Sequence, residues 1–357
     1  MKKYALVTGS GGLIGSEAVK HLCADGYTVI GIDNNMRAYF FGKEAGTDWN
    51  TKRLLNLFPE QFKPLDVDIR NYEKLNNIFT DVKFELVIHT AAQPSHDWAA
   101  NDPKTDFSVN AVGTLNLLEL VKIYCPDASF IFTSTNKVYG DTPNTLPLIE
   151  LKTRYELPKS HIFWNGIEEN MSIDHSTHSL FGVSKTAADL LTQEYSRYFG
   201  LKTVVFRGGC LTGPMHSASE LHGFLAYLVK CIVNETPYTV YGYKGKQVRD
   251  NIHSQDLIQM FMEFHRNPKD QAVYNAGGGR ENSISILEAV DLISTISNKT
   301  PKINIVEENR RGDHQWYITN NSKFIKDYPE WKITYKLDKL IEEMVYAVQH
   351  NRQQSTK

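Results

Sequence analysis

The sequence predicts an α/β protein built on a doubly wound parallel β-sheet, and three features indicate this fold class. Short runs rich in β-branched residues alternate with amphipathic helical patterns through the first half of the chain, as in parallel strands joined by crossover helices. A glycine-rich turn, residues 8–12, directly follows the first apolar run. An acidic residue, Asp33, ends the second run about 20 residues later. The alternation predicts the sheet, and the turn identifies the edge of the sheet where a ligand binds in such folds.

The predicted elements follow this alternation. Strands are expected near residues 4–8, 28–33, 61–66, 86–90, 129–134, 203–207 and 239–241. Helices are expected near residues 13–24, 72–80, 105–124, 178–191, 223–233, 255–265, 284–296 and 337–348. Residues 34–59 break the rhythm, and we expect a long loop there that forms a mobile flap near the ligand. Residues 1–206 are expected to form mainly the large sheet domain, residues 207–350 mainly a smaller C-terminal α+β lobe with interleaved segments, and residues 351–357 a disordered tail.

Composition narrows the class of protein. The chain has 357 residues, of which 41% are hydrophobic and 22% charged, and its net charge of -2 indicates neither a nucleic-acid nor a membrane partner. No run approaches the roughly 20 apolar residues of a membrane span. The four cysteines, Cys23, Cys125, Cys210 and Cys231, lack the C-x-x-C spacing of a metal site, and nothing indicates a disulfide framework. We therefore expect a cytoplasmic, globular protein without a metal.

The glycines of the first turn predict a dinucleotide site. Gly9, Gly12 and Gly15 follow a strand and open a helix, where backbone amides can approach a pyrophosphate. Asp33 is placed to accept hydrogen bonds from the adenosine ribose and to repel a 2′-phosphate, which favours NAD over NADP. Arg37 lies close by in the sequence, and its positive charge argues for NADP rather than NAD. The prediction is a Rossmann-type sheet that binds NAD.

A second pattern begins the helix after the long irregular segment. In Ser179-Leu180-Phe181-Gly182-Val183-Ser184-Lys185, Phe181 and Lys185 are four positions apart and therefore share one helix face. The outline is that of a Tyr-x-x-x-Lys catalytic helix with phenylalanine in the place of the tyrosine.

The G-x-x-G-x-x-G spacing, taken with this helix, resembles the extended short-chain dehydrogenase/reductases, the group of NAD-dependent epimerases and dehydratases. Asp68-Ile69-Arg70-Asn71 resembles the adenine-contacting segment of that family, and Ala91-Ala92-Gln93 resembles the segment whose backbone passes along the cofactor. Residues 134–141 and 245–250 resemble the corresponding segments of CDP-paratose (CDP-tyvelose) 2-epimerases. The family pattern covers nearly the whole chain.

The resemblance implies roles for individual residues. Thr135 would hydrogen-bond the reacting sugar oxygen, and Lys185 would bind the nicotinamide ribose. The implied cofactor contacts are Gly9, Gly12, Leu13, Ile14, Gly15, Asp33, Asn34, Asp68, Ile69, Ala91, Ala92, Gln93, Asn110 and Lys185. The implied nucleotide-sugar contacts are Asn136, Lys137, Arg207, Arg249 and Arg311. Family members commonly pair through two helices, so a homodimer is expected.

Phe181 leaves the acid–base role of the family without its usual residue. The tyrosine at this place in the family is the base, and phenylalanine has no ionisable group. Three explanations are open: no residue fills the acid–base role, another residue fills it, or the reaction does not need it. An engineered Tyr→Phe variant is one form of the first explanation. His96, which follows the fourth strand, and Cys210 are the main replacement candidates. The further candidates are Tyr139, Glu168, Glu169, His178 and Ser179.

Three functions follow from the resemblance. The first is a nucleotide-sugar epimerase with tightly bound NAD, which acts on carbon 2 of a CDP-hexose or on carbon 4 of a UDP-hexose. The second is a 4,6-dehydratase, which in the family needs an acid pair at the places that Asn136 and Lys137 hold here. The third is a catalytically silent protein that binds NAD and a sugar nucleotide. The missing acids argue against dehydration, and Phe181 is the best support for the silent protein.

Overall fold

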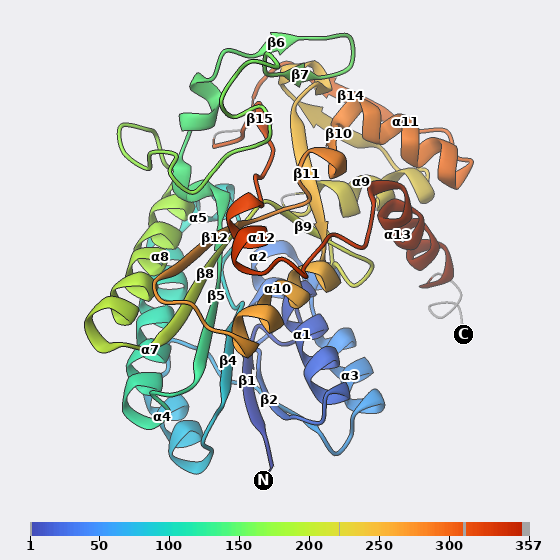
Figure 1. The fold of residues 1–357 in the computed structure, drawn as a ribbon. Helices are drawn as coiled ribbons and strands as arrows, with labels where there is room; N and C mark the ends of the chain where they lie inside the picture. The colour runs from blue at the N-terminus through green and yellow to red at the C-terminus, as the bar shows by residue number, and fades with distance from the viewer. Residues whose placement is uncertain (1, 221, 310–311, 352–357) are drawn as a thin grey trace. The chain divides into compact units, whose positions relative to one another are not determined.

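The computed structural model describes residues 2–220, 222–309 and 312–351 (Figure 1). The chain forms two compact units, each assembled from three segments. Unit 1 is drawn from the chain up to Val138, from Ser179–Arg207 and from Leu257–Tyr274, and unit 2 from Tyr139–His178, Gly208–Asp256 and the chain from Asn275 onward. Every helix among the described residues is too short or too polar to cross a membrane.

A seven-stranded sheet forms the centre of unit 1. Its strands are β1 (Tyr4–Thr8), β2 (Thr28–Ile32), β3 (Phe62–Leu65), β4 (Leu86–His89), β5 (Ser129–Thr135), β8 (Lys202–Gly208) and β12 (Ala272–Ala276). They are ordered β12-β8-β5-β4-β1-β2-β3, and β1 pairs in parallel with both β2 and β4. The strand order reverses at β1, which is the doubly wound arrangement. The predicted fold class is therefore confirmed.

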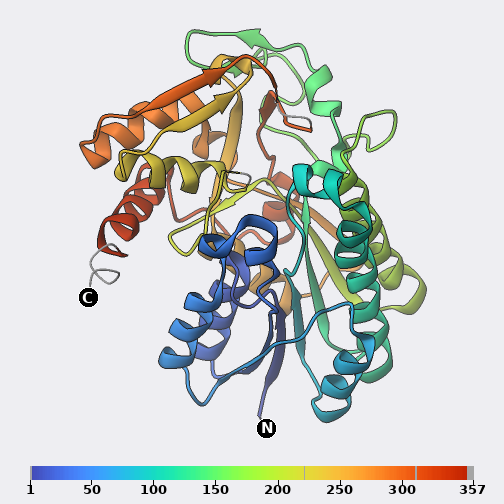
Figure 2. The ribbon, with the colours of Figure 1, turned by 180° about the vertical axis from the view of Figure 1, so that it is seen from behind.

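Helices cover both faces of this sheet. They are α1 (Leu13–Ala24), α2 (Met36–Phe41), α3 (Asp48–Leu57), α4 (Tyr72–Asp81), α5 (His96–Asn101), α6 (Pro103–Phe107), α7 (Gly113–Tyr124), α8 (Leu180–Phe199) and α10 (Ser254–Arg266). Figures 1 and 2 show α4, α7 and α8 on one face and α1 and α3 on the other. Because both faces are covered, Ala5, Leu6 and Val7 in the central strand are all fully buried.

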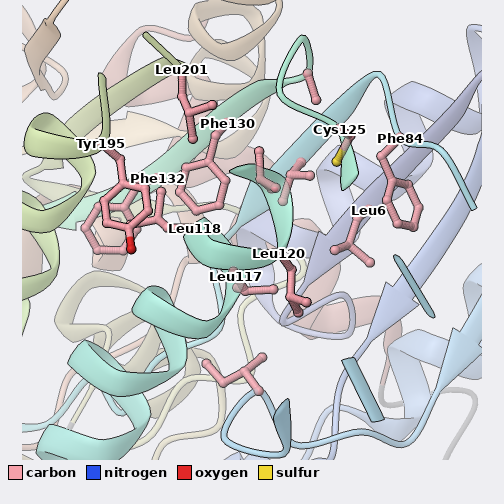
Figure 3. Packing of buried hydrophobic residues seen from close by; sticks show 14 of the residues in the cluster. Leu6, Phe84, Leu117, Leu118, Leu120, Cys125, Phe130, Phe132, Tyr195 and Leu201 are labelled. Carbon is pink, nitrogen blue, oxygen red and sulfur yellow. The ribbon is translucent and has the colours of Figure 1, made fainter. Parts of the chain in front are cut away.

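The core under α7 and α8 is mainly aliphatic and aromatic. Leu117 and Leu118 of α7 lie beside Phe130 and Phe132 of β5, and Tyr195 of α8 joins the same cluster (Figure 3). The two leucines and two phenylalanines are at most 1% exposed. Burial of each such side chain contributes roughly 1.5–3 kcal/mol, so this packing fixes the position of α8 on the sheet.

Two expectations about unit 1 are wrong. Residues 34–59, expected to be a loop, form α2, a 3₁₀ turn and α3. They are ordered by local contacts that periodicity does not reveal, including an edge-to-face pair between Phe40 and Trp98 with centroids 4.4 Å apart. The helix expected at residues 105–124 is divided into α6, a π-helical turn at Ser108–Val112, and α7.

Unit 2 combines short strands with four α-helices among its described residues. The strands are β6 (Ile149–Glu150), β7 (Tyr155–Glu156), β9 (Cys210–Thr212), β10 (Tyr238–Tyr241), β11 (Val248–His253), β13 (Ser283–Ser285), β14 (Ile303–Val306) and β15 (Trp316–Tyr317). The helices are α9 (Phe224–Val233), α11 (Ile286–Ser297), α12 (Ser322–Asp327) and α13 (Leu337–Asn351). Helices α9, α11 and α13 share one apolar core with β10. Of the predicted tail, residues 351–357, Asn351 ends α13, and residues 352–357 lie outside the described residues.

Candidate active site

The glycine turn after β1 is shaped for close approach of backbone to a ligand. Gly9 has a φ of 68°, in the left-handed region that favours glycine. A Cβ atom on Gly15 would lie 2.1 Å from the carbonyl oxygen of Gly9, so only glycine fits there. Gly12, the N-cap of α1, has no side chain to cap the first amides of that helix. The turn therefore fits a pyrophosphate, whose charge the helix N-terminus favours.

Asp33 is fixed beside this turn by two backbone amides. Gly11 N donates to its Oδ2 and Asn35 N to its Oδ1, both at 2.8 Å. Burial raises the pKa of Asp33, and the two amide hydrogen bonds oppose that shift. Arg37 lies with its guanidinium 5.0 Å from the centre of the Phe41 ring, and burial lowers its pKa to about 10. Asp33 is therefore well ordered for a ribose contact.

The segment expected to contact adenine is held by an ion pair. Arg70 binds Asp68 through Nε (3.0 Å to Oδ1) and Nη2 (2.6 Å to Oδ2). Asn34 donates to the same Oδ2 at 3.1 Å. Burial alone would raise the pKa of Asp68, but the hydrogen bonds and charge of Arg70 outweigh burial and lower it. A shallow hollow is lined by Asp68, Arg70, Asn71 and Tyr72.

A buried polar network connects the 91–95 segment to helix α8. Asn110, in the π-helical turn, accepts from Gln93 N (2.9 Å), and its Nδ2 lies 3.0 Å from both Gln93 O and Ser184 Oγ. Asp106 accepts from Asn110 and, at 2.8 Å, from Gln93 Nε2. Burial raises the pKa of Asp106, and hydrogen bonds from Ser184 and Gln93 oppose the shift. The cofactor contacts expected for Asn110 and Gln93 stay predictions, and in this structure both residues brace the segment.

Helix α8 places Lys185 under the sheet edge. Lys185 is 4% exposed; its Nζ donates to Thr133 O at 2.8 Å and lies 4.2 Å from the centre of the Phe132 ring. Burial lowers the pKa of Lys185 to about 7, although the charges of Asp189 and Asp106 act in the opposite direction. Burial therefore favours the neutral amine of Lys185 more than water does.

Thr135 ends strand β5, two positions beyond the carbonyl that Lys185 binds. Its Oγ1 accepts from Lys137 N at 3.2 Å and lies 3.5 Å from Oδ1 of Asn136. Asn136 is 6% exposed. The hydroxyl of Thr135 thus stands at the carboxyl end of the strand, where ligands of such sheets bind.

His96 and Phe181 are brought together from distant parts of the chain. Their rings meet edge to face, with centroids 5.1 Å apart and an interplanar angle of 75°. Nδ1 of His96 lies 2.6 Å from Oγ of Ser179, the residue that caps α8. An imidazole and a hydroxyl therefore stand beside the ring that occupies the usual phenol position.

Arg207 has an internal partner. Its Nε and Nη2 bind the two oxygens of Asp189 at 3.0 and 3.1 Å, and Ser134 donates to the same carboxylate. Both charged side chains are almost fully buried. The diphosphate contact expected for Arg207 stays a prediction, and it would have to use guanidinium hydrogens that Asp189 does not take.

In unit 2, Arg249 donates from Nη1 to Val248 O at 2.7 Å and pairs through Nη2 with Asp313. Cys210 lies on β9 in register with Asn251 of β11 and is partly exposed. Arg311 lies outside the described residues. The roles expected for these three residues stay predictions.

Comparison with known proteins places these features in a family. A profile of the NAD dependent epimerase/dehydratase family matches residues 5–277. The chain belongs to this family. It is 33% identical over 300 residues to CDP-paratose 2-epimerase of Salmonella typhi, covering 82% of this chain and 84% of the relative. It is 28% identical to UDP-glucuronate 4-epimerase of Thermodesulfobacterium geofontis, covering 84% and 82%.

A solved structure of similar fold is a tyrosine-to-phenylalanine variant of UDP-glucuronic acid 4-epimerase from Bacillus cereus, in complex with UDP-4-deoxy-4-fluoro-glucuronic acid and NAD. Its TM-score is 0.77 at 24% identity, covering 98% of this chain and 99% of that one.

Membership of the epimerase/dehydratase family confirms the prediction of an NAD-dependent enzyme of this class. The glycine turn and Asp33 fit the cofactor that the family uses, because the turn leaves room only for hydrogen at Gly15 and Asp33 is held by main-chain amides. The structure adds residues that sequence reasoning left unassigned, namely Asp106, Ser184 and Asp189. Spacing could have indicated two of them. Asp106 lies four positions before Asn110, and Asp189 lies four positions after Lys185.

Proposed function

We propose that the chain is an NAD-dependent epimerase that inverts carbon 2 of a CDP-hexose. The observation that carries this proposal is the similarity to the CDP-paratose 2-epimerase of Salmonella typhi, which extends over most of both chains. The ordered Lys185 and Thr135 support catalysis at the end of β5. Arg249 supports recognition of the nucleotide, because a guanidinium binds a diphosphate through parallel hydrogen bonds.

In this proposal NAD, when bound, supplies a group that takes a hydride from the sugar carbon and returns it to the opposite face. The chain supplies orientation and proton transfer. Thr135 Oγ1 hydrogen-bonds the oxygen on the reacting carbon, and Lys185 holds the nicotinamide ribose. Asp33 and the glycine turn bind the adenosine end. The sugar passes through a ketone, and no net oxidation results.

Phe181 favours one alternative, a protein that binds NAD and a sugar nucleotide without turnover. The Bacillus cereus variant, which also carries a phenylalanine for a tyrosine, is described in complex with both kinds of ligand. Lys185 and Thr135 argue against a silent protein, because Thr135 stands where the resemblance implies a contact with the reacting sugar oxygen, and burial lowers the pKa of Lys185, a shift common at catalytic sites. Dehydration is disfavoured because Asn136 and Lys137 offer no carboxylic acid.

We also propose a homodimer that pairs through α8 and the helical segment at residues 105–124. Apolar side chains on these elements are exposed, with Phe107 at 46%, Val112 at 41%, Val183 at 47% and Leu190 at 41%. Light scattering tests this proposal, since Val183→Lys combined with Leu190→Lys is expected to yield a monomer.

The test of the function is incubation with NAD and a panel of CDP-, UDP-, GDP- and dTDP-hexoses, followed by NMR. Inversion at carbon 2 of a CDP-hexose is expected, with a deuterium on that carbon retained. Exchange of this deuterium with solvent would exclude the hydride route. Inversion at carbon 4 of a UDP-hexose would replace the proposed substrate, and tight binding without any product would favour the silent protein.

A further inference from the structure

The start of α8 brings a hydroxyl and an imidazole together beside Phe181. Ser179 is the N-cap of α8, and its Oγ accepts a hydrogen bond from Gly182 N at 3.1 Å. The same oxygen lies 2.6 Å from Nδ1 of His96. Both residues are partly exposed, whereas the neighbouring Phe181 is 6% exposed. The pair is therefore partly accessible, and His96 borders the ring at the position of the family's phenol.

The capping geometry suits Ser179 for proton transfer. Since its oxygen accepts from the Gly182 amide, its own hydrogen is available to the imidazole nitrogen. The oxygen also lies at the N-terminus of a helix of 20 residues, where negative charge is stabilised. A partial negative charge on Oγ during proton transfer is thus favoured by the same amide that caps the helix.

His96 is held in place by the residues that precede it. The side chain of Gln93, fully buried, accepts from Ser95 N at 2.5 Å and donates to Ser95 O at 2.8 Å. Ser95 in turn caps α5, of which His96 is the first residue. On the far side of His96, Trp98 packs on Phe40 of α2. The imidazole is therefore fixed at both ends of its segment, which a relay requires.

We propose that Ser179 and His96 form a proton relay that takes the place of the missing phenol, an inference that rests on the proposed epimerase function. The sugar hydroxyl gives its proton to Ser179 Oγ while the Ser179 proton moves to Nδ1 of His96. The hydrogen on the same carbon leaves as hydride with two electrons, which the nicotinamide cofactor takes, and the C–O bond becomes C=O. The reverse transfers restore both residues, so the cycle balances.

Two substitutions of Ser179 separate the relay from the cap. Threonine and asparagine both cap helices, but only threonine keeps a hydroxyl that can pass a proton. Ser179→Thr is expected to keep most of the turnover, and Ser179→Asn to lose at least about a hundredfold in kcat, the usual contribution of general acid–base catalysis. Equal thermal stability of the two variants serves as the control. Equal turnover of the two variants would overturn the relay.

His96→Asn offers an oxygen to Ser179 but cannot take a proton. The expected result is a loss of kcat similar to that of Ser179→Asn, with KM and NAD affinity unchanged. His96→Ala in the presence of free imidazole should recover part of the lost turnover. Turnover of His96→Asn equal to that of the parent protein would contradict the inference.

A further readout does not depend on turnover. With ¹⁵N-labelled histidine, the His96 signals are identified by their loss in His96→Asn, and the hydrogen bond at Nδ1 is measured from their chemical shifts. Ser179→Asn is expected to move the His96 Nδ1 signal, and Ser179→Thr to leave it nearly in place. An unmoved signal in both would exclude the pair. No product from any nucleotide sugar with the parent protein would overturn the proposed function and the relay together, whereas parental turnover that survives in both asparagine variants would overturn the relay alone.

Discussion

The glycine turn after β1 and the first turn of α8 both carry predicted ligand contacts in unit 1, but their geometries are fixed by different means. The glycine turn depends on the main chain, through the φ of 68° at Gly9 and the 2.1 Å that would separate a Cβ atom on Gly15 from Gly9 O. The start of α8 depends on side chains, because Ser179 meets His96 from 83 positions away. Main-chain geometry of this kind tolerates almost no substitution. A pair of side chains, in contrast, can be replaced by other side chains that perform a different chemical role.

This difference explains why the two regions depart from the family pattern to different degrees. Gly9, Gly12 and Gly15 keep the dinucleotide spacing intact, and any larger residue at Gly15 would collide with backbone. The family resemblance implies a catalytic phenol at the position of Phe181, whose ring is buried and packs edge to face on the ring of His96. Chemistry at the start of α8 can therefore change while the cofactor site stays the same.

The largest effect is expected for Gly15→Ala. Because its Cβ would meet Gly9 O at 2.1 Å, the turn must open, which should cost about 3 kcal/mol of unfolding free energy and abolish measurable NAD binding. Gly12→Ala in the same turn is the companion variant and should cost less, because its Cβ would lie 3.3 Å from Gly9 O and its φ is -70°. Denaturant unfolding and NAD titration by fluorescence measure both variants. Wild-type affinity in Gly15→Ala would show that the main chain is less restrictive than argued.

Lys185→Met tests the buried lysine of α8. Loss of the amine from its place beside Thr133 O is expected to lower kcat by about a hundredfold or more. Lys185→Arg is the companion variant, because arginine keeps a positive charge but not the lowered pKa of Lys185. Steady-state kinetics on the substrate found in the panel measures both variants, and unchanged kcat in Lys185→Met would exclude a catalytic role.

Lys185→Met is also expected to change how the free energy of unfolding depends on pH. Burial lowers the pKa of Lys185 to about 7 from an ordinary value of 10.5, so between these values the unfolded chain binds more protons than the folded one. The contribution of Lys185 to stability is therefore least favourable below pH 7 and improves as the pH rises toward 10.5. Urea unfolding at pH 7 and pH 9.5 should show this gain in the parent protein and a smaller gain in Lys185→Met.

Much of the fold follows from patterns that the sequence displays directly. The strands at Tyr4–Thr8 and Thr28–Ile32 and the helix Leu13–Ala24 follow from apolar runs, glycine positions and period. Strand β12, Ala272–Ala276, was not predicted, because the run is short and includes the polar Asn275. Helices α2 and α3 escaped prediction because aromatic contacts such as Phe40 with Trp98 order them.

Part of the candidate site was also predictable from local sequence patterns. Spacing alone indicates Gly9, Asp33 and the Phe181–Lys185 face, because each depends on neighbours in the chain. No local pattern indicates that His96 meets Ser179, since that contact depends on how α5 and α8 pack. The division of residues 105–124 at Ser108–Val112 is similarly set by the polar network around Asn110, which only the folded chain assembles.

A smaller effect is expected for Asp33→Asn, which removes the charge but leaves an oxygen for one of its two amide partners, Gly11 N or Asn35 N. NAD affinity should fall about tenfold, which corresponds to about 1.4 kcal/mol, and the preference for NAD over NADP should narrow. Asp48→Asn removes a nearby charge that is exposed and serves as the control. Titration with each cofactor measures the ratio of the two affinities. A preserved ratio in Asp33→Asn would assign cofactor choice to another residue.

The smallest effect is expected for Phe181→Tyr. This variant best distinguishes a proton relay through Ser179 and His96 from a vacant acid–base role. If Ser179 and His96 carry the proton, a new phenol adds a second route beside a working one, and kcat should change by no more than about threefold. The informative background is Ser179→Asn, where the relay is broken and a phenol near Lys185 should restore part of the turnover. Recovery there, with little change in the parent protein, would show that the two chemistries are exchangeable at one helix start. A gain of tenfold or more from Phe181→Tyr alone would instead show that the acid–base role is vacant in this chain.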